Sequence, residues 1–178
     1  MRIFVISDIH GSSNDLNTFI KIFNEEQGDL LVILGDILSH GPRNMLPEGY
    51  DPKSVIETLN QYKSKILWIK GNCDAEVDEM VLDFQVSESG VLYYSNRRIY
   101  LTHGHKHNEN NMNLCSNDIL LYGHLHVNFL KEKDGVIIGN PGSISLPKEN
   151  TQKSYMLIEN NEIAIFNLKK EKIMNIKI

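Results

Sequence analysis

Side chains that can bind metal ions recur along this chain, and each group of them follows a run of apolar residues. The candidates are two carboxylates, one amide and four imidazoles: Asp8, His10, Asp36, Asn72, His103, His124 and His126. Seven ligands are too many for one tetrahedral zinc ion. Oxygen donors mixed with imidazole suit Mn, Fe, Co, Ni or Zn, and the set would fit two ions that share one carboxylate. Two such ions favour displacement at phosphorus, which indicates hydrolysis of phosphate esters.

Strands and helices must position these ligands, and the first half of the chain predicts an alternation of the two. Short apolar, β-branched runs at 2–7, 30–34 and 66–70 predict buried strands. Apolar residues at helical spacing predict one helix from Ser12 or Ser13 to Gly28, and Asp51 with Pro52 predicts the start of another after the loop 39–51. The candidate ligands follow the strands directly, and ligands of open α/β sheets bind at the carboxyl ends of strands.

From about residue 84 the pattern changes to hairpins with short polar turns. The expected pairs are 91–95 with 98–102, 129–133 with 136–139, and 155–158 with 163–167. A separate buried strand at 119–122 ends just before His124, and the basic run 169–172 predicts an exposed turn before a last short strand. No change of composition marks a linker. We therefore expect one α/β domain, 1–178, whose halves form two mixed β-sheets packed face to face as a sandwich with flanking helices.

The composition narrows the classes of function. The chain has 178 residues, of which 41% are hydrophobic, enough for one sizeable core. A formal net charge of -5 argues against an extended nucleic-acid surface or an anionic membrane as partner. No apolar stretch approaches the ~20 residues of a membrane span, and the N-terminus lacks a signal-peptide layout, so we expect a cytoplasmic protein. Cys73 and Cys115 form no CxxC pair, which fits a reducing compartment.

Five ordered motifs resemble the signature of the calcineurin-like metallophosphoesterase superfamily. They are Asp8-x-His10, Gly35-Asp36, Gly71-Asn72-Cys73-Asp74, His103-Gly104 and Gly123-His124-x-His126. The stretches 40–44, 47–50 and 140–143 are similar to those of small bacterial phosphodiesterases of the YfcE type within that superfamily. The resemblance spans most of the chain and implies the superfamily's fold of two mixed sheets with flanking helices. One such motif is a weak signal, whereas five in order are specific.

Position by position, the resemblance implies two metal sites and their ligands. Asp8, His10, Asp36 and His126 would hold the first ion, and Asp36, Asn72, His103 and His124 the second. Asp36 would bridge the ions, and a hydroxide between them would attack phosphorus, with Asn72 and His103 beside the reacting group. We expect Mn²⁺, with Zn²⁺, Fe, Ni²⁺ or Co²⁺ as alternatives.

Cys73 departs from the superfamily pattern, in which histidine commonly follows the Gly-Asn pair. A thiol is a poorer proton donor to a leaving oxygen than an imidazolium, and its ionised form is negative. Loss of a cation there should harm dianionic monoesters more than monoanionic diesters. We therefore expect a small phosphodiester substrate, with a catalytic role for Cys73 or none beyond filling space. Arg43 and His105 are candidate substrate contacts.

Other interpretations stay open. Asp8, Asp36 and Asn72 could be turn or cap residues, the commoner role after a strand. Arg43 could be solvated or lie at a contact between subunits of a homo-oligomer, and the stretch 140–143 could orient the site or only form a turn. The alternative activity is that of a phosphomonoesterase. The alternative from another class is a non-catalytic protein-binding scaffold, since a retromer subunit resembles this fold; the complete ligand set favours the enzyme.

Overall fold

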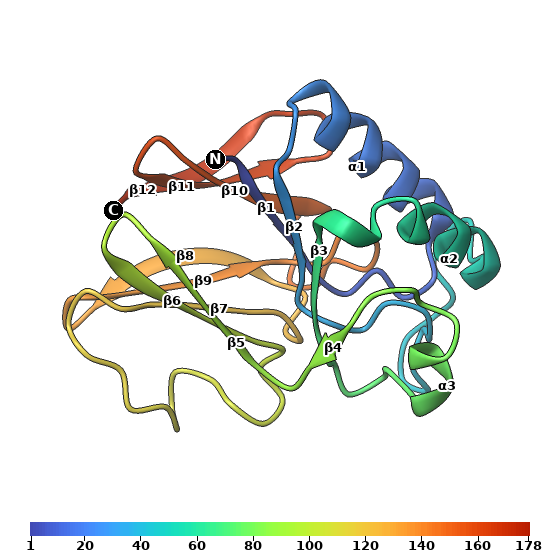
Figure 1. Cartoon of the computed structure of the whole chain (residues 1–178), viewed down its shortest axis with the longest axis horizontal. Coiled ribbons are helices and arrows are strands. Elements are labelled where there is room, and N and C mark those ends of the chain that lie inside the picture. The colour runs from blue at the N-terminus through green and yellow to red at the C-terminus, as the bar shows by residue number, and fades with distance from the viewer.

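Two mixed β-sheets pack face to face in the computed structural model, which describes all residues from Met1 to Ile178 (Figure 1). One sheet has seven strands in the order β12-β11-β10-β1-β2-β3-β4, and the other has five in the order β5-β6-β7-β9-β8. The elements are β1 (Ile3–Ile6), α1 (Ser13–Glu25), β2 (Leu30–Ile33), α2 (Pro52–Asn60), a 3-10 turn (Lys63–Lys65), β3 (Ile66–Ile69), α3 (Glu76–Glu79), β4 (Val86–Ser87), β5 (Gly90–Tyr94), β6 (Arg97–Thr102), β7 (Ile119–Tyr122), β8 (Asn128–Lys133), β9 (Val136–Pro141), β10 (Ser154–Glu159), β11 (Glu162–Asn167) and β12 (Lys172–Lys177). The expected sandwich is confirmed.

The division of strands between the sheets differs from the expected one. β1, β2 and β3 are parallel neighbours, as the alternating first half predicts. The C-terminal strands, however, return to this sheet, because β10 pairs antiparallel with β1, with Val5 opposite Met156. The two halves of the chain therefore do not correspond to the two sheets. The strand pattern of β10 is visible in the sequence, but its partner lies about 150 residues away and leaves no local signal.

One of the two large hydrophobic cores lies between the sheets, and the other lies under the helices. Fourteen buried apolar residues form the core between the sheets, among them Ile3 and Val5 of β1 and Ile119 and Leu121 of β7. Residues in between on β1, such as Phe4, face the other way and pack under α1. This alternation follows from the period of two in a strand, and it gives the seven-stranded sheet two buried faces.

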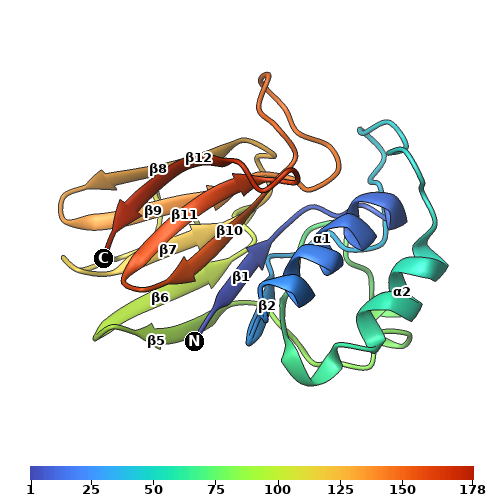
Figure 2. The same cartoon turned by 90° about the horizontal axis from the view of Figure 1, so that it is seen from above.

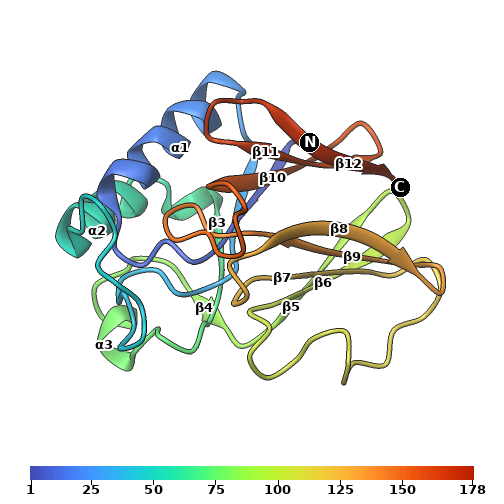
Figure 3. The same cartoon turned by 180° about the vertical axis from the view of Figure 1, so that it is seen from behind.

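Helices cover only one side of the sandwich. α1 and α2 lie over the outer face of the seven-stranded sheet (Figure 2). The outer face of the five-stranded sheet is covered instead by the irregular segment 103–118, whose Met112 and Leu114 pack on Leu120 and Tyr122 (Figure 3). No helix of the chain combines the length and the apolar character needed to span a membrane.

The helix starts fix the loops that lead to the site. Ser12 caps α1 by accepting a hydrogen bond from the Asp15 amide, and Asp51 caps α2 ahead of Pro52, as the sequence predicts. Ser12 also donates to the Glu48 carbonyl over 3.0 Å, which ties the loop 39–51 to the end of β1.

Candidate metal centre

The candidate ligands meet where β1, β2, β3, β6 and β7 end. One buried group consists of Asp8 and His10, which follow β1, and His126, which follows β7; the first two are 0% exposed and His126 is 2% exposed. Asp8 Oδ1 lies 3.2 Å from His126 Nε2 and 3.7 Å from His10 Nε2. The two Nε2 atoms are 3.2 Å apart. The spacing of all three residues therefore suits ligands of one metal ion.

Backbone carbonyls fix the orientation of these histidines. His10 Nδ1 lies 2.7 Å from the Ser39 carbonyl oxygen, and His126 Nδ1 lies 2.7 Å from that of Leu146. A carbonyl only accepts, so each Nδ1 carries the hydrogen, and in the form of the ring that can bind a metal ion the lone pair of Nε2 points toward the other ring. Asp8 Oδ1 is buried between them without a hydrogen-bond partner. Three electron-rich atoms thus face one another, an arrangement that a cation stabilises and that fits a metal ion.

Asp36 joins this group to a second one. Its Oδ2 lies 3.8 Å from His10 Nε2 and 3.4 Å from His103 Nε2. His103 Nδ1 donates to the Leu34 carbonyl over 2.5 Å, and its Nε2 lies 3.1 Å from Asn72 Oδ1. The ring of His124 is 5.2 Å from that of His103, centroid to centroid. Five carboxylate and imidazole candidates thus cluster tightly, with Asn72 and His124 beside them nearer the surface.

Charge and burial set the protonation of the cluster. Burial opposes ionisation of Asp36, but its hydrogen bond to His103, the charge of His103 and the Cys73 amide hold the pKa of Asp36 well below its usual range. Burial also opposes protonation of His103, yet Asp36 and the charge of Asp8 raise the pKa of His103 to about 9. Burial lowers the pKa of His10. The carboxylates are therefore ionised and His10 is neutral at pH 7, as metal ligands must be, whereas His103 is protonated and would have to release its proton to a metal ion.

Cys73 lies beside the Asp36 carboxylate. Its amide donates to Asp36 Oδ1 over 2.8 Å, so the backbone at this position helps to orient Asp36. Burial, followed by the negative charge of Asp36, raises the pKa of Cys73 to about 12. The thiol is therefore neutral at physiological pH and brings no charge to the site.

The backbone is unusual at most of the candidate ligands. Asp8, His10, Asp36, His124 and His126 all have positive φ, between 49° and 67°. Few residues other than glycine adopt this left-handed conformation, and those that do concentrate at functional sites. Five such residues in one cluster mark it as the functional site independently of its chemistry.

Asp74 supports the site, although the sequence motif that contains it gave it no role. Its carboxylate accepts from the amides of Asp36 at 2.9 Å, Ile37 at 2.8 Å and Gly71 at 2.7 Å, and from Trp68 Nε1 at 3.2 Å. It thereby holds the loop after β2 against the loop after β3. Only the motif could have drawn attention to it, because its partners lie on two separate strands.

The stretch 140–143 also contacts the ligand loops. Asn140 Nδ2 donates to the Gly123 carbonyl over 2.7 Å, and the hydroxyl of Ser143 donates to the Asp8 carbonyl over 2.6 Å. These bonds tie the end of β9 to the residues around Asp8 and His124. They favour an orienting role over that of a simple turn.

A cavity of about 720 Å³ opens beside the metal centre. Its walls include Asp36, Asn72, Cys73 and both histidines after β7, together with Arg43. His105 is not part of its lining and instead lies against the rings of His103 and His124, at 5.3 and 6.2 Å between centroids. Lys148, which the sequence did not single out, lines the cavity as well.

Comparisons with known proteins agree with this geometry. The model of the calcineurin-like phosphoesterase superfamily domain matches residues 1–162. Phosphodiesterase YfcE of Escherichia coli K12 is 39% identical over 176 residues, which cover 98% of this chain and 96% of that protein. The solved structure of the phosphoesterase YfcE from E. coli superposes with a TM-score of 0.97 at 38% identity and covers 99% of each chain.

A more distant structure shares the fold alone. Vps29 from Entamoeba histolytica, solved in complex with Zn²⁺, superposes with a TM-score of 0.63 at 22% identity over 100% of this chain and 98% of that one. Three findings agree on the family of this chain. They are the extent of the family match, the identity to YfcE and the cluster of candidate ligand atoms. The chain is a hydrolase of the calcineurin-like phosphoesterase superfamily.

Proposed function

We propose that this chain hydrolyses phosphodiester bonds with two divalent metal ions. The observation that carries the proposal is the place of the Asp36 carboxylate, whose Oδ2 lies within 3.8 Å of His10 on one side and 3.4 Å of His103 on the other. A carboxylate between two groups of ligand atoms suits a bridge between two ions. The identity to YfcE, a phosphodiesterase, supports the type of ester.

The two ligand sets share Asp36. Asp8, His10 and His126 complete the first, and Asn72, His103 and His124 complete the second. Bound ions of this kind lower the pKa of water and neutralise charge on phosphoryl oxygens. We propose Mn²⁺ as the ion, with Zn²⁺, Fe, Ni²⁺ or Co²⁺ as alternatives, because oxygen and imidazole donors mix in both sets.

The residues around the ligands favour a diester over a monoester. Cys73 is neutral and lines the cavity where many relatives would carry an imidazole. A monoester brings a second negative charge, and its leaving oxygen benefits from a nearby cation or acid. Asn72 and His103 lie closest to the reacting group in this proposal, and Arg43, on the cavity wall, and His105 are the candidate substrate contacts.

We also propose that 1–178 folds as one domain in a reducing compartment such as the cytoplasm. The shared core between the sheets supports the first statement, since both sheets contribute to its 14 residues. Two free cysteines, one of them exposed, support the second.

The test compares a diester with a monoester on the same preparation. Purified protein is stripped with a chelator, reloaded separately with Mn²⁺, Zn²⁺, Ni²⁺, Co²⁺ and Fe²⁺, and assayed on bis(4-nitrophenyl) phosphate and 4-nitrophenyl phosphate, with metal content measured by mass spectrometry. We expect activity to vanish on chelation and return with two ions per chain, with the diester favoured. Preference for the monoester would support the alternative activity, and metal binding without hydrolysis would support a scaffold.

A further inference from the structure

Two cations line the cavity without a carboxylate partner. Arg43 lies on the loop after β2 and Lys148 on the loop after β9, and both side chains are exposed on the cavity wall. Neither residue takes part in any ion pair of the molecule. Their charges are therefore free to meet an anion that enters the cavity.

The backbone of Lys148 is fixed by the site itself. Its amide donates to the His126 carbonyl over 2.9 Å, and its carbonyl accepts from the Thr151 amide over 3.0 Å and the Thr151 hydroxyl over 2.7 Å. Between them, Glu149 and Asn150 have φ of 51° and 60°, which indicates a tight turn of type I′. Hydrogen bonds to His126 and Thr151 and the turn at 149–150 thus fix the backbone of Lys148 relative to His126.

Arg43 stands on a similarly built segment. The side chain of Asn44 donates to the His40 carbonyl over 2.8 Å, and the backbone amide of Asn44 donates to the Gly41 carbonyl over 3.3 Å. Gly41 has φ of 74°, and a β-carbon there would come within 2.9 Å of Cys73 Sγ. The turn that carries Arg43 therefore packs directly against the floor of the cavity.

The same two segments orient His10 and His126. The Ser39 carbonyl accepts from His10, and the Leu146 carbonyl accepts from His126. Each segment then continues by a few residues to a free cation, Arg43 or Lys148. Figure 2 shows the two loops, cyan near residue 45 and orange near residue 148, projecting on the same side of the molecule. Metal ligands and cations are thus positioned by common supports.

The charge balance shows what these cations could bind. Under the proposed function, two divalent ions outweigh the carboxylates of Asp8 and Asp36, so a monoanionic diester already meets an excess of positive charge. Arg43 and Lys148 would add two more positive charges to a group that needs none. A second anionic group on the substrate would use them, and an arginine and a lysine that line the same cavity suit a carboxylate or a phosphate.

We propose that Arg43 and Lys148 form an anion subsite for a second anionic group of the substrate, next to the scissile diester. This inference rests on the proposed phosphodiesterase function and narrows its substrate class to diesters that carry an additional carboxylate or phosphate. Arg43 and Lys148 together distinguish such substrates from simple diesters.

The test uses three 4-nitrophenyl phosphodiesters that differ only at the far end of the second ester arm, which bears a hydroxyl, a carboxylate or a phosphate. The quantity compared is kcat/KM for each anionic substrate divided by kcat/KM for the hydroxyl substrate. We expect Lys148→Gln to lower this ratio about tenfold, which corresponds to about 1.4 kcal/mol, with most of the change in KM. The larger of the two ratios identifies carboxylate or phosphate as the natural group.

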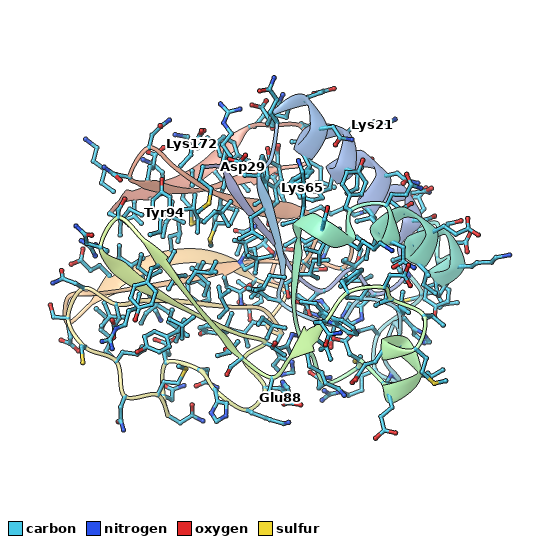
Figure 4. The ribbon with its side chains drawn as sticks, viewed as in Figure 1. Lys21, Asp29, Lys65, Glu88, Tyr94 and Lys172 are labelled. Atoms are coloured by element: carbon cyan, nitrogen blue, oxygen red, sulfur yellow. The ribbon has the colours of Figure 1, made fainter.

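Two further variants control for nonspecific effects. Lys148→Arg keeps the charge and should retain the ratio. Lys21→Gln removes an exposed charge from α1, far from the cavity, and should also retain it (Figure 4). Arg43→Gln should lower the ratio as Lys148→Gln does. An unchanged ratio in Lys148→Gln would overturn the subsite.

Binding of non-hydrolysable analogues separates this inference from the proposed function. Phosphonate versions of the three diesters are titrated into the metal-loaded protein by calorimetry. The dissociation constant of each anionic phosphonate is then compared with that of the hydroxyl phosphonate. If no diester is cleaved but the anionic phosphonates bind more tightly to the wild type than to Lys148→Gln, the phosphodiesterase proposal fails and the subsite stands. If all three bind equally to both proteins, the subsite is wrong.

Discussion

The two ends of the ligand cluster differ in how far they are withdrawn from solvent. Asp8, His10 and His126, which we call the deep group, are at most 2% exposed, and carbonyl oxygens orient both of their rings. Asn72 and His124, which we call the rim pair, are exposed and half-buried, respectively. A site with pre-oriented ligands loses little freedom when an ion binds, whereas an open one must exchange with water and substrate. We therefore expect tight metal binding at the deep group and substrate access at the rim pair.

Asp36 is part of both proposed ligand sets, so its replacement should weaken metal binding in both of them. Asp36→Asn removes the charge that two ions would share, and we expect both ions to be lost and kcat/KM to fall at least about a thousandfold, roughly 4 kcal/mol. Elemental analysis of metal content checks this. Asp29→Asn, which changes an exposed carboxylate before the amino end of β2, is the matched control. A full complement of metal in the Asp36 variant would contradict the bridging role.

Asp74 connects the loop that carries Asp36 to the loop after β3, and its loss should destabilise the fold itself. Asp74→Ala leaves the amides of Asp36, Ile37 and Gly71 and the Trp68 ring without their acceptor. We expect the free energy of unfolding to drop by about 3 kcal/mol, because unpaired buried donors are costly. Asp78→Ala removes a single cap to the Ala75 amide and should cost about 1 kcal/mol. Urea denaturation measures the free energy of unfolding of both variants. Equal decreases in the two variants would count against the role of Asp74.

Removing one histidine from each end measures the difference directly. His10→Ala takes a ligand from the deep group and should empty one metal position while the other keeps its ion. His124→Ala takes a ligand from the rim pair, which we expect to contribute less affinity. The dissociation constant of the weakened ion should rise at least about tenfold more for His10→Ala, or about 1.4 kcal/mol. Metal titration by calorimetry gives both constants, and the reverse order would show that depth does not set affinity.

An effect no larger than the last is expected at Cys73, which lies beside Asp36 and Asn72. Cys73→His places an imidazole beside the leaving oxygen and should assist monoesters more than diesters. We expect the ratio of monoesterase to diesterase kcat/KM to rise at least about tenfold, or roughly 1.4 kcal/mol. Paired assays on aryl monoesters and diesters with Mn²⁺, with metal content checked in both proteins, measure it. An unchanged ratio with intact metal sites would mean that pocket shape or Arg43 sets the preference.

Local patterns predicted nearly all of the strands and both long helices. Apolar runs and polar turns are properties of neighbouring residues, so β8 with β9 and β10 with β11 were expected as hairpins and are observed as such. β4 and α3, with two and four residues, are too short to show a period. The pairing of β10 with β1 depends on the global packing of the chain and was not predictable from either strand.

The candidate ligands could be found because each follows a strand that the sequence reveals. The residues that orient these ligands could not be found in this way, because Ser39 and Leu146 act through carbonyl oxygens, which every residue possesses. Asp74 and Lys148 were overlooked for a related reason. Their importance depends on neighbours brought together from several loops, and their own sequence surroundings resemble ordinary turns.

The left-handed backbone at the candidate ligands has an evolutionary consequence. Each of Asp8, His10, Asp36, His124 and His126 occupies a conformation that glycine or asparagine would adopt more easily. Drift toward those residues would relax backbone strain of about 1 kcal/mol or more at a position while destroying a metal ligand. Selection for catalysis must therefore act continuously against selection for stability at these positions. A lineage released from catalysis should lose these side chains first, and its folded domain should gain in thermal tolerance.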